Sequence, residues 1–249
     1  MKLGLRYYQR EAIETAYDFL RKHKKNPCIV LPTGAGKTPV MASICNDVVA
    51  RWSGRVLILS HVKELIKQTA ETLHEWHPEL DVGVYSAGLN RRDKKSDVLV
   101  AGIQSVHAKG LELTGDRPFN IVLVDEAHRI PTSGDGMYRR LLTDLGIASP
   151  TIRVIGLTAT PYRLKGGYVC GDDHFLNEVC YEAGIKELIA KNYLCPLISK
   201  QSKSSIDSSE LKIKNGEFDN KGMSDIYDTD EKVSLACREI ADLTRDRKS

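Results

Sequence analysis

Short apolar runs alternate along the chain with longer segments whose apolar residues recur at helical spacing. The runs lie at 28–30, 56–59, 82–85, 98–101, 121–124 and 154–157. Unbroken apolar character is typical of strands buried on both faces of a sheet. Helical spacing predicts helices over 8–23, 61–76 and 185–193, and near the end of the chain through Val233, Ala236, Ile240 and Leu243. This alternation predicts an α/β fold with a mostly parallel sheet flanked by helices in three layers, α/β/α.

Polar segments directly follow three of the predicted strands. Pro-Thr-Gly-Ala-Gly-Lys-Thr occupies 32–38, Asp-Glu-Ala-His occupies 125–128 and Thr-Ala-Thr occupies 158–160. In parallel α/β sheets, ligands bind beyond the carboxyl ends of the strands. We therefore expect these three segments to converge on one crevice.

The first of these segments has the residue types of a phosphate-binding loop. Gly34 and Gly36 permit a tight turn that aims N–H groups at phosphate oxygens, and a helix starting near Lys37 adds its positive dipole end. The Lys37 ammonium suits the β- and γ-phosphates, and the Thr38 hydroxyl suits Mg²⁺. Leu31 stands where the general pattern has glycine. The predicted nucleoside triphosphate site consists of Thr33, Gly34, Ala35, Gly36, Lys37 and Thr38.

The two adjacent carboxylates suit triphosphate hydrolysis. Asp125 is expected to hold Mg²⁺, usually through water, and Glu126 to orient and deprotonate the attacking water. Lys37 and the metal offset charge on the γ-phosphoryl group as it leaves. The acidic pair and the later Thr-Ala-Thr argue against a nucleoside kinase or a transport ATPase that shares only the phosphate loop.

Composition changes this picture little. The formal net charge of the 249 residues is +3, too small to identify a nucleic-acid partner. The six cysteines include no Cys-x-x-Cys pair, which predicts reduced thiols in a cytoplasmic protein and argues against a zinc site built from Cys170, His174, Cys180 and Cys195. No stretch approaches the roughly 20 apolar residues of a membrane span, so we expect no membrane partner.

The three motifs together resemble the first RecA-like domain of superfamily 2 helicases of the DEAH type, in order and in spacing. The nearest resemblance is to RadD-type bacterial DNA repair helicases, carried by residues 5–9, 156–164 and 192–196, and it extends over about residues 3–198. It implies a RecA-like P-loop NTPase fold, ATP and Mg²⁺ as cofactors, and single-stranded or branched DNA as a partner.

The resemblance also implies roles for residues outside the phosphate loop. Gln9, with Arg6, would read the adenine through its amide. Lys37, Asp125, Glu126 and His128 would form the catalytic set, and His128, Thr158 and Thr160 would couple the nucleotide to the nucleic-acid face. Residues 60–68 and 102–106 match the family's nucleic-acid-contacting segments, which places Ser60, Lys63, Gln104 and Ser105 against the phosphate backbone. Such contacts predict a grip that does not depend on base sequence.

We expect two parts in this chain. Residues 1–198 are predicted to form the helicase ATP-binding domain, and 199–249 a linker and a terminal helix. The stretch 199–209 is rich in Ser, Lys and Asp and buries too little apolar surface to fold alone. Nothing after Thr160 resembles the family's second RecA-like domain, which supplies arginine fingers. We therefore expect the chain to lead toward an absent second domain and to hydrolyse ATP very slowly by itself.

Two alternative functions stay open at the level of sequence. An RNA helicase or the motor of a restriction enzyme shares the same motifs, and no residue identifies a reader of the 2′-OH that distinguishes RNA from DNA. A nucleotide-gated binding module would hold ATP or ADP without turnover, although the intact Lys37, Asp125 and Glu126 favour turnover. The basic stretch 90–95 is predicted to be a solvated loop, with a contact to the phosphate backbone as the less favoured alternative.

Overall fold

The computed structural model describes residues 4–131, 136–163, 167–196, 213–214, 217–218, 224, 228 and 230–244. These residues fall into two compact units, Met1–Leu194 and Cys195–Ser249. The second unit contains the antiparallel pair β11 (Ile213–Lys214) and β12 (Glu217–Phe218) and the helix α9 (Asp230–Thr244). The predicted linker at 199–209 lies outside the described residues.

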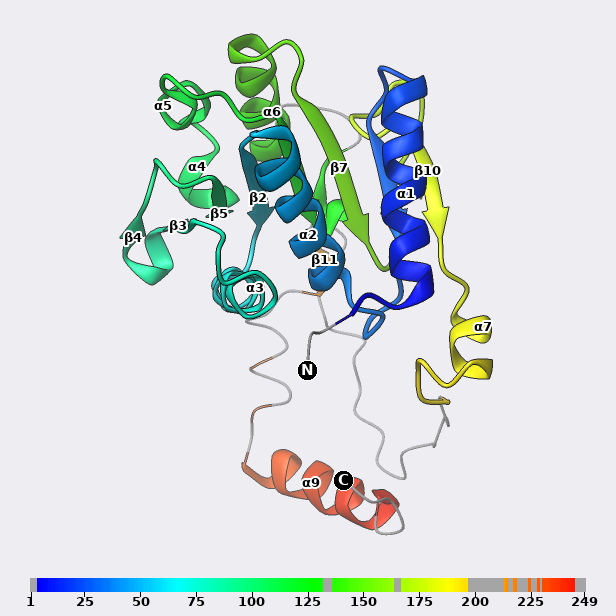
Figure 1. Ribbon diagram of the computed structural model, residues 1–249. Helices are drawn as coiled ribbons and strands as arrows, with labels where there is room; N and C mark the ends of the chain where they lie inside the picture. Colours follow the sequence, from blue (N-terminus) through cyan, green and yellow to red (C-terminus); the bar gives the residue numbers. More distant parts are fainter. Residues whose placement is uncertain are drawn as a thin grey trace. The chain divides into compact units, whose positions relative to one another are not determined.

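An eight-stranded sheet forms the centre of the first unit (Figure 1). Its strand order is β10-β1-β7-β6-β2-β5-β3-β4, and every ladder is parallel except β3–β4. The strands are β1 (Pro27–Val30), β2 (Val56–Ser60), β3 (Val82–Ser86), β4 (Arg91–Arg92), β5 (Val98–Gly102), β6 (Ile121–Asp125), β7 (Arg153–Thr158) and β10 (Glu178–Glu182). All six predicted strands are present, and the mostly parallel sheet is confirmed.

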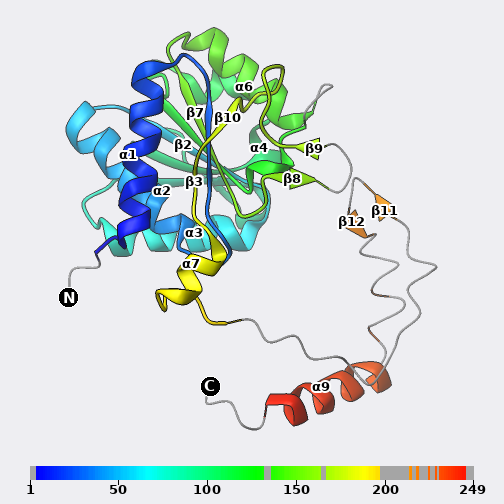
Figure 2. The same cartoon turned by 90° about the vertical axis from the view of Figure 1, so that its right-hand side faces the viewer.

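Helices cover both faces of the sheet and enclose two cores. One core lies against α1 (Tyr7–Lys22), α2 (Lys37–Asn46), α3 (Lys63–Trp76) and α7 (Ile185–Ala190). The other lies against α4 (Ile103–Val106), α5 (Gly110–Thr114) and α6 (Met137–Ala148). Figure 2 shows α1 and α2 on one side of the sheet and α4 and α6 on the other. In β2, Ile58 packs into the first core and its neighbours Leu57 and Leu59 into the second, as the alternation of a pleated strand requires.

The short elements connect this framework. The helix α2 continues into a π-helical turn, η1 (Asp47–Arg51), and 3-10 turns form η2 (Ala87–Leu89) and η3 (Ala127–Arg129). After β7, the antiparallel pair β8 (Tyr162–Arg163) and β9 (Gly167–Tyr168) forms a small hairpin. The Val169 N–H donates to the Pro161 carbonyl, so the chain closes on itself just beyond the Thr-Ala-Thr turn.

The structure corrects three sequence-based boundaries. Arg91 and Arg92, predicted to lie in a loop, pair with the edge strand β3 because an unpaired edge offers free backbone groups. The helix predicted over 185–193 ends at Ala190, and Asn192 adopts a left-handed conformation with φ 59° that turns the chain back. The helix predicted from residue 61 begins at Lys63.

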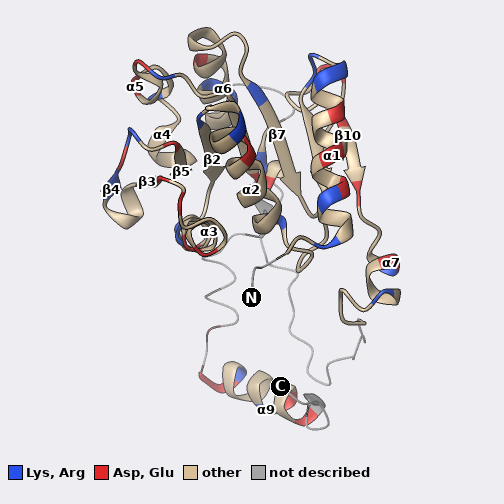
Figure 3. Cartoon of the chain, in the orientation of Figure 1, with Lys and Arg blue, Asp and Glu red and all other residues tan. Residues whose placement is uncertain are grey.

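Charged residues are concentrated outside the sheet. In Figure 3, the helices α1 and α3 carry both signs of charge, whereas the strands are mostly uncharged. Of the Asp, Glu, Lys and Arg residues that the structure describes, Arg55 at 3% exposure and Asp125 at 6% are nonetheless almost fully covered. Among the described residues, no helix combines the length and the apolar character needed to cross a bilayer.

Candidate active site

Three adjacent strands end in the three predicted motifs. The strands β1, β7 and β6 are neighbours in the sheet, so the segments that follow them lie side by side. Val30 pairs with Thr158, and Asp125 pairs with Leu157, which brings the strand ends level. The Leu31 N–H donates to the Thr158 carbonyl at 3.0 Å. The predicted convergence on one edge of the sheet is therefore present in the fold.

The phosphate loop owes its path to two glycines and a buried leucine. Gly34 and Gly36 have φ of 80° and 84°, in the left-handed region that favours glycine. Gly36 is the residue before α2, so the loop leads directly into the helix amino terminus, where free N–H groups favour an anion. Leu31 is fully buried in the core beneath α1 and α2, so the position that departs from the general pattern is a packing position.

A continuous series of polar contacts joins the loop to the acidic residues and the threonine turn. Lys37 Nζ lies 3.4 Å from Glu126 Oε1, and Glu126 Oε2 lies 3.4 Å from His128 Nδ1. His128 Nδ1 lies 3.0 Å from Thr158 Oγ1. The Thr158 hydroxyl donates to the Thr160 carbonyl and accepts from the Thr160 N–H, both at 3.1 Å. These contacts join the phosphate loop to the chain beyond β7.

The backbone around Glu126 is strained. This residue has φ 50° and ψ 51°, a left-handed conformation that is uncommon for a side chain of its size. Its N–H donates to Asp125 Oδ1 at 3.0 Å, which satisfies one carboxylate oxygen. The turn aims the Glu126 carboxylate back toward Lys37 on the neighbouring loop, instead of letting it continue the direction of β6.

Asp125 is placed where a cation is favoured. Burial, and secondly the adjacent Glu126 carboxylate, raise the pKa of Asp125 to about 6, and Lys37 opposes this shift. The two carboxylates therefore carry more negative charge than the single ammonium offsets. Thr38, the second residue of α2, carries the hydroxyl that the sequence predicts as a further oxygen ligand. An oxygen set this small fits Mg²⁺, which keeps several waters and takes further oxygens from phosphates.

The raised pKa predicts a pH-dependent stability in metal-free buffer. An unfolded Asp titrates near pH 3.9, so between about pH 4 and pH 6 the folded state binds more protons than the unfolded state. The free energy of unfolding therefore falls as the pH rises through this window. Asp125→Asn removes that loss and is expected to be more stable than the parent at pH 7, by on the order of 3 kcal/mol. Urea unfolding in EDTA at pH 4 to 7 measures this; parallel profiles for the two proteins would contradict it.

Gln9 lies against the phosphate loop, and Arg6 contacts Gln9. The Gln9 side chain is almost fully buried, at 4% exposure. Its Nε2 donates to the Ala35 carbonyl at 2.9 Å and to the Gly36 carbonyl at 3.3 Å. Its Oε1 accepts from the Arg6 N–H at 2.8 Å. The predicted adenine reader thus ties the start of α1 to the loop. Tyr8, for which the sequence predicted no role, donates its hydroxyl to the same Ala35 carbonyl at 2.8 Å. Its position beside Gln9 was the only signal in the sequence.

The four predicted nucleic-acid residues do not behave alike. Lys63 at the start of α3 and Gln104 in α4 are exposed, beyond the carboxyl ends of the neighbouring strands β2 and β5. Gln104 Nε2 donates to the His61 carbonyl at 2.9 Å, and Ser105 Oγ accepts from the Ala87 N–H at 2.8 Å. Ser60 is fully buried at the end of β2, so its hydroxyl does not reach the surface that the other three share.

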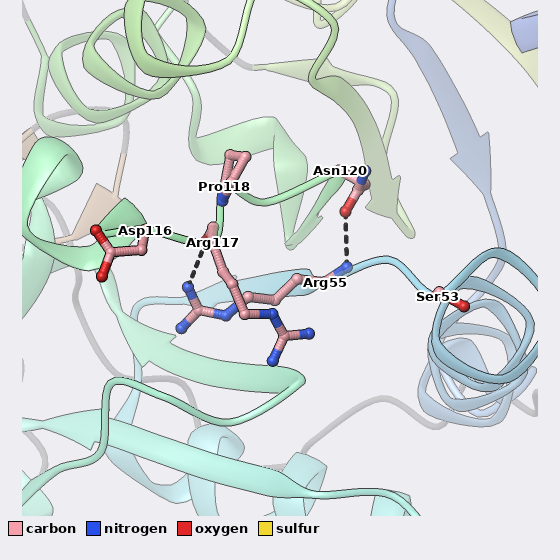
Figure 4. Close-up of a pocket in the computed structure, with 6 residues that line it drawn as sticks. All are labelled: Ser53, Arg55, Asp116, Arg117, Pro118 and Asn120. Carbon is pink, nitrogen blue, oxygen red and sulfur yellow. Dashed lines mark hydrogen bonds between the residues drawn. The ribbon is translucent and has the colours of Figure 1, made fainter.

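A separate cavity of about 250 Å³ lies at the amino-terminal ends of the strands, where β2 and β6 begin (Figure 4). Arg55 donates there to the carbonyls of Ser96, Leu113 and Arg117, and its guanidinium lies over the Phe119 ring. The cavity is lined by Ser53, Arg55, Asp116, Arg117, Pro118 and Asn120. These contacts connect loops to the strand starts and give Arg55 a structural role. Within the described ranges, no group of three or more His, Cys, Asp or Glu side chains is arranged to hold a metal.

Comparison with known proteins assigns the family. The family model described as "Type III restriction enzyme, res subunit" matches residues 2–163. The chain belongs to this family. The matched range of the chain contains all three motifs and the strands that they follow. Its fold is that of the amino-terminal RecA-like domain of superfamily 2 helicases.

Curated relatives of this res-subunit family member are longer than the chain. It is 30% identical over 215 residues to the DNA 3′-5′ translocase XPB2 of Sulfurisphaera tokodaii, covering 86% of the chain and 44% of the relative. It is 28% identical over 235 residues to IRC3 of Saccharomyces cerevisiae, which is named as an ATP-dependent helicase, covering 91% and 33%. The chain thus spans between a third and a half of the length of these relatives.

Solved structures share its fold. A nuclease-deletion mutant of the Type ISP restriction-modification enzyme LlaGI, in complex with a DNA substrate mimic, gives a TM-score of 0.58 at 19% identity, covering 77% of this chain and 21% of that chain. The UvsW helicase from bacteriophage T4 gives 0.57 at 16% identity, covering 72% and 60%. At these identities the likeness establishes the arrangement of strands and helices alone.

Proposed function

We propose that this chain is the ATP-hydrolysing motor domain of a helicase or translocase that moves on DNA. The observation that carries the proposal is the unbroken contact series from Lys37 through Glu126 and His128 to Thr158 and Thr160. A lysine that binds phosphate, a carboxylate that acts as a base on water, and a turn in contact with both are the parts that a nucleotide-driven motor requires.

Each residue has a distinct task in the proposed reaction. The loop N–H groups and the start of α2 bind the phosphates, and Lys37 approaches the γ-phosphoryl group. Glu126, freed from Lys37 when phosphate takes its place, orients a water for in-line attack and accepts its proton. Thr38 and Asp125 would hold Mg²⁺, which when bound neutralises charge on the phosphate oxygens.

His128 and Thr158 are the proposed coupling elements. Because the Thr158 hydroxyl donates to Thr160, its oxygen is left to accept from His128 Nδ1–H. The same nitrogen lies 3.4 Å from Glu126 Oε2, so His128 has two competing partners. A shift of Glu126 during turnover changes the balance between them and repositions the Thr-Ala-Thr turn.

The finer assignment is also a proposal. The likeness to RadD-type DNA repair helicases and the similarity to the DNA translocase XPB2 support single-stranded or branched DNA as the substrate, with RNA as the alternative. By the same likeness, a second RecA-like domain would supply arginine fingers, each worth roughly a thousandfold or more in phosphoryl transfer. The division of the chain near residue 198 and a cytoplasmic location belong to this proposal as well.

The decisive experiment measures ATP hydrolysis with and without single-stranded DNA. We expect slow hydrolysis by this chain and faster, DNA-stimulated hydrolysis when a second RecA-like domain is supplied on the same polypeptide. If hydrolysis is undetectable in both, with DNA or RNA, the motor assignment is wrong and a nucleotide-gated binding role becomes the better account.

The exposed pair Lys63 and Gln104 gives a prediction for the DNA face. We expect the double variant Lys63→Ala/Gln104→Ala to bind single-stranded DNA roughly tenfold more weakly, because one ion pair and one amide hydrogen bond to phosphate are lost. Fluorescence anisotropy with a labelled oligonucleotide at two salt concentrations measures it, and the salt dependence should become shallower. Lys22→Ala is the matched control, because Lys22 is an exposed lysine at the carboxyl end of α1. Equal losses in both proteins would remove this face from the proposal.

The family assignment favours one second candidate, the motor of a restriction enzyme. Such a motor uses the same nucleotide site but translocates along duplex DNA. Displacement of a third strand from a DNA triplex, without separation of the duplex, distinguishes it from a helicase. Separation of the two duplex strands would support the helicase form of the leading proposal.

A further inference from the structure

The chain beyond α7 turns back onto the start of α1. Asn192 adopts φ 59°, and both the Tyr193 and Leu194 N–H groups donate to the Leu188 carbonyl, at 2.8 and 3.2 Å. This tight turn fixes the direction of two apolar side chains, both partly buried against the core that contains the phosphate loop. Figure 1 shows α7 beyond the end of β10, at the edge where α1 begins.

The ring of Tyr193 supports the Arg6 guanidinium. The Arg6 guanidinium carbon lies 5.2 Å from the ring centroid, and Arg6 Nη1 donates to the Tyr193 carbonyl at 3.2 Å and to the Tyr8 hydroxyl at 3.1 Å. The rings of Tyr7 and Tyr8 pack against Tyr193 at centroid distances of 5.6 and 5.4 Å. One turn of chain therefore holds the guanidinium by a cation–π contact and a hydrogen bond at once.

The same cluster reaches the phosphate loop by two routes. The Tyr8 hydroxyl, which accepts from Arg6, donates in turn to the Ala35 carbonyl at 2.8 Å. On the other side, Leu194 Cδ2 lies 3.4 Å from the position that a Cβ on Gly34 would occupy. The turn and the loop thus touch, although more than 150 positions separate them in the chain.

Polar contacts hold α7 in this position. The Tyr7 hydroxyl donates to Glu187 Oε1 at 2.7 Å, and Lys191 Nζ donates to Tyr7 and to Glu187 at 2.9 and 2.7 Å. The Lys191 ammonium also lies 4.3 Å from the Tyr7 ring centroid. These groups are largely exposed, so each contact is modest, but together they define one docking position for the helix on α1.

We infer that the turn at 191–194 closes the base side of the proposed nucleotide site, with Tyr193 as a positioning residue. Tyr193 holds the Arg6 guanidinium plane in place, and that plane is the stacking surface for a purine base. This inference rests on the proposed function. A guanidinium stacks on flat aromatic groups, and one that is already ordered loses less conformational entropy when a base binds.

The test separates base binding from phosphate binding. Competition against a fluorescent ATP analogue measures the affinities of ATP and of inorganic tripolyphosphate, which has phosphates but no base. We expect Tyr193→Leu to weaken ATP binding about tenfold and to leave tripolyphosphate binding at the parent level, because the Arg6 stacking surface loses its aromatic support while the phosphate-binding groups are unchanged. Tyr193→Phe keeps the ring and should retain ATP affinity. Tyr162→Leu, an exposed tyrosine on the β8–β9 hairpin, is the control.

A second variant does not depend on the packing of Tyr193. Arg6→Lys keeps the charge but loses the planar group, and is expected to reduce the ATP-to-tripolyphosphate affinity ratio as Tyr193→Leu does. If ATP affinity is unchanged in Tyr193→Leu and Arg6→Lys, or if both ligands weaken equally, the inference is overturned while the proposed function stands. If the parent protein binds neither ligand, the proposed function itself fails.

Discussion

Glu126→Gln is expected to lower the rate of ATP hydrolysis about a hundredfold or more while ATP binding is kept. The amide has nearly the shape of the carboxylate but does not accept the proton of the attacking water, and general-base catalysis contributes a factor of this size. The substitution also removes one of the charges that raise the pKa of Asp125. The site therefore becomes less negative, and nucleotide affinity should be equal to or higher than that of the parent.

Single-turnover hydrolysis with protein in excess over radiolabelled ATP measures this change, since it detects slow rates. Glu182→Gln is a matched control because Glu182 also ends a parallel strand, β10, next to β1. A hydrolysis rate that is the same in Glu126→Gln and in Glu182→Gln would contradict the assignment of the water-activating residue. Loss of ATP binding in Glu126→Gln would instead assign Glu126 to holding the loop through Lys37.

Gly36→Ala is expected to reduce ATP affinity by one to two orders of magnitude. A left-handed conformation is unfavourable by about 1–2 kcal/mol for a residue with a Cβ, and Gly36 has φ 84°. The added Cβ would also lie 2.4 Å from Gln9 Nε2, far inside van der Waals contact. The loop must shift to relieve both, and the N–H groups that face phosphate shift with it. Calorimetric titration with ATP measures the loss.

A glycine elsewhere in the fold provides the opposite expectation. Gly146 lies within α6 and has no positive φ, and a Cβ added there would meet no neighbouring atom within 4 Å. Gly146→Ala should therefore keep ATP affinity and raise the free energy of unfolding by about 0.5–1 kcal/mol. If both alanine variants bind ATP like the parent, the loop conformation is not the determinant of the site. Comparison of the double variant Gly36→Ala/Gln9→Ala with Gln9→Ala alone separates the clash from the backbone strain, because Gln9 is itself expected to contact the adenine.

Much of the fold follows from local pattern. The six apolar runs predict the six central parallel strands because a strand buried on both faces needs apolar side chains at every position. Other elements were not predicted, for physical reasons that differ from one element to the next. The edge strand β10 reads Glu-Val-Cys-Tyr-Glu and is only half covered, so its sequence lacks that signal. The helix α6 carries Tyr138, Leu141, Leu142 and Leu145 at helical spacing, a pattern that by itself predicts a helix.

In the candidate site, too, some features follow from neighbouring residues in the sequence and others only from the tertiary structure. Gly34, Gly36 and Lys37 are recognisable because neighbours in sequence make the phosphate loop, and a strand end followed by Asp125 and Glu126 carries its own chemistry. Motif spacing does not say which neighbouring groups engage these residues. Gln9 bonds to the loop carbonyls and Ser60 lies beneath the surface, and neither placement is visible in the residue types.

The sequence by itself determined the α/β class, the central parallel strands, and the residues that carry phosphate and water chemistry, since each depends on side chains close together along the chain. Tertiary structure alone decided the strand order, the contact series from Lys37 to Thr160, and the pairing of Arg6 with Tyr193, which are 187 positions apart. Contacts of that kind arise from how helices and strands pack, and packing depends on the whole set of buried surfaces and not on any one segment.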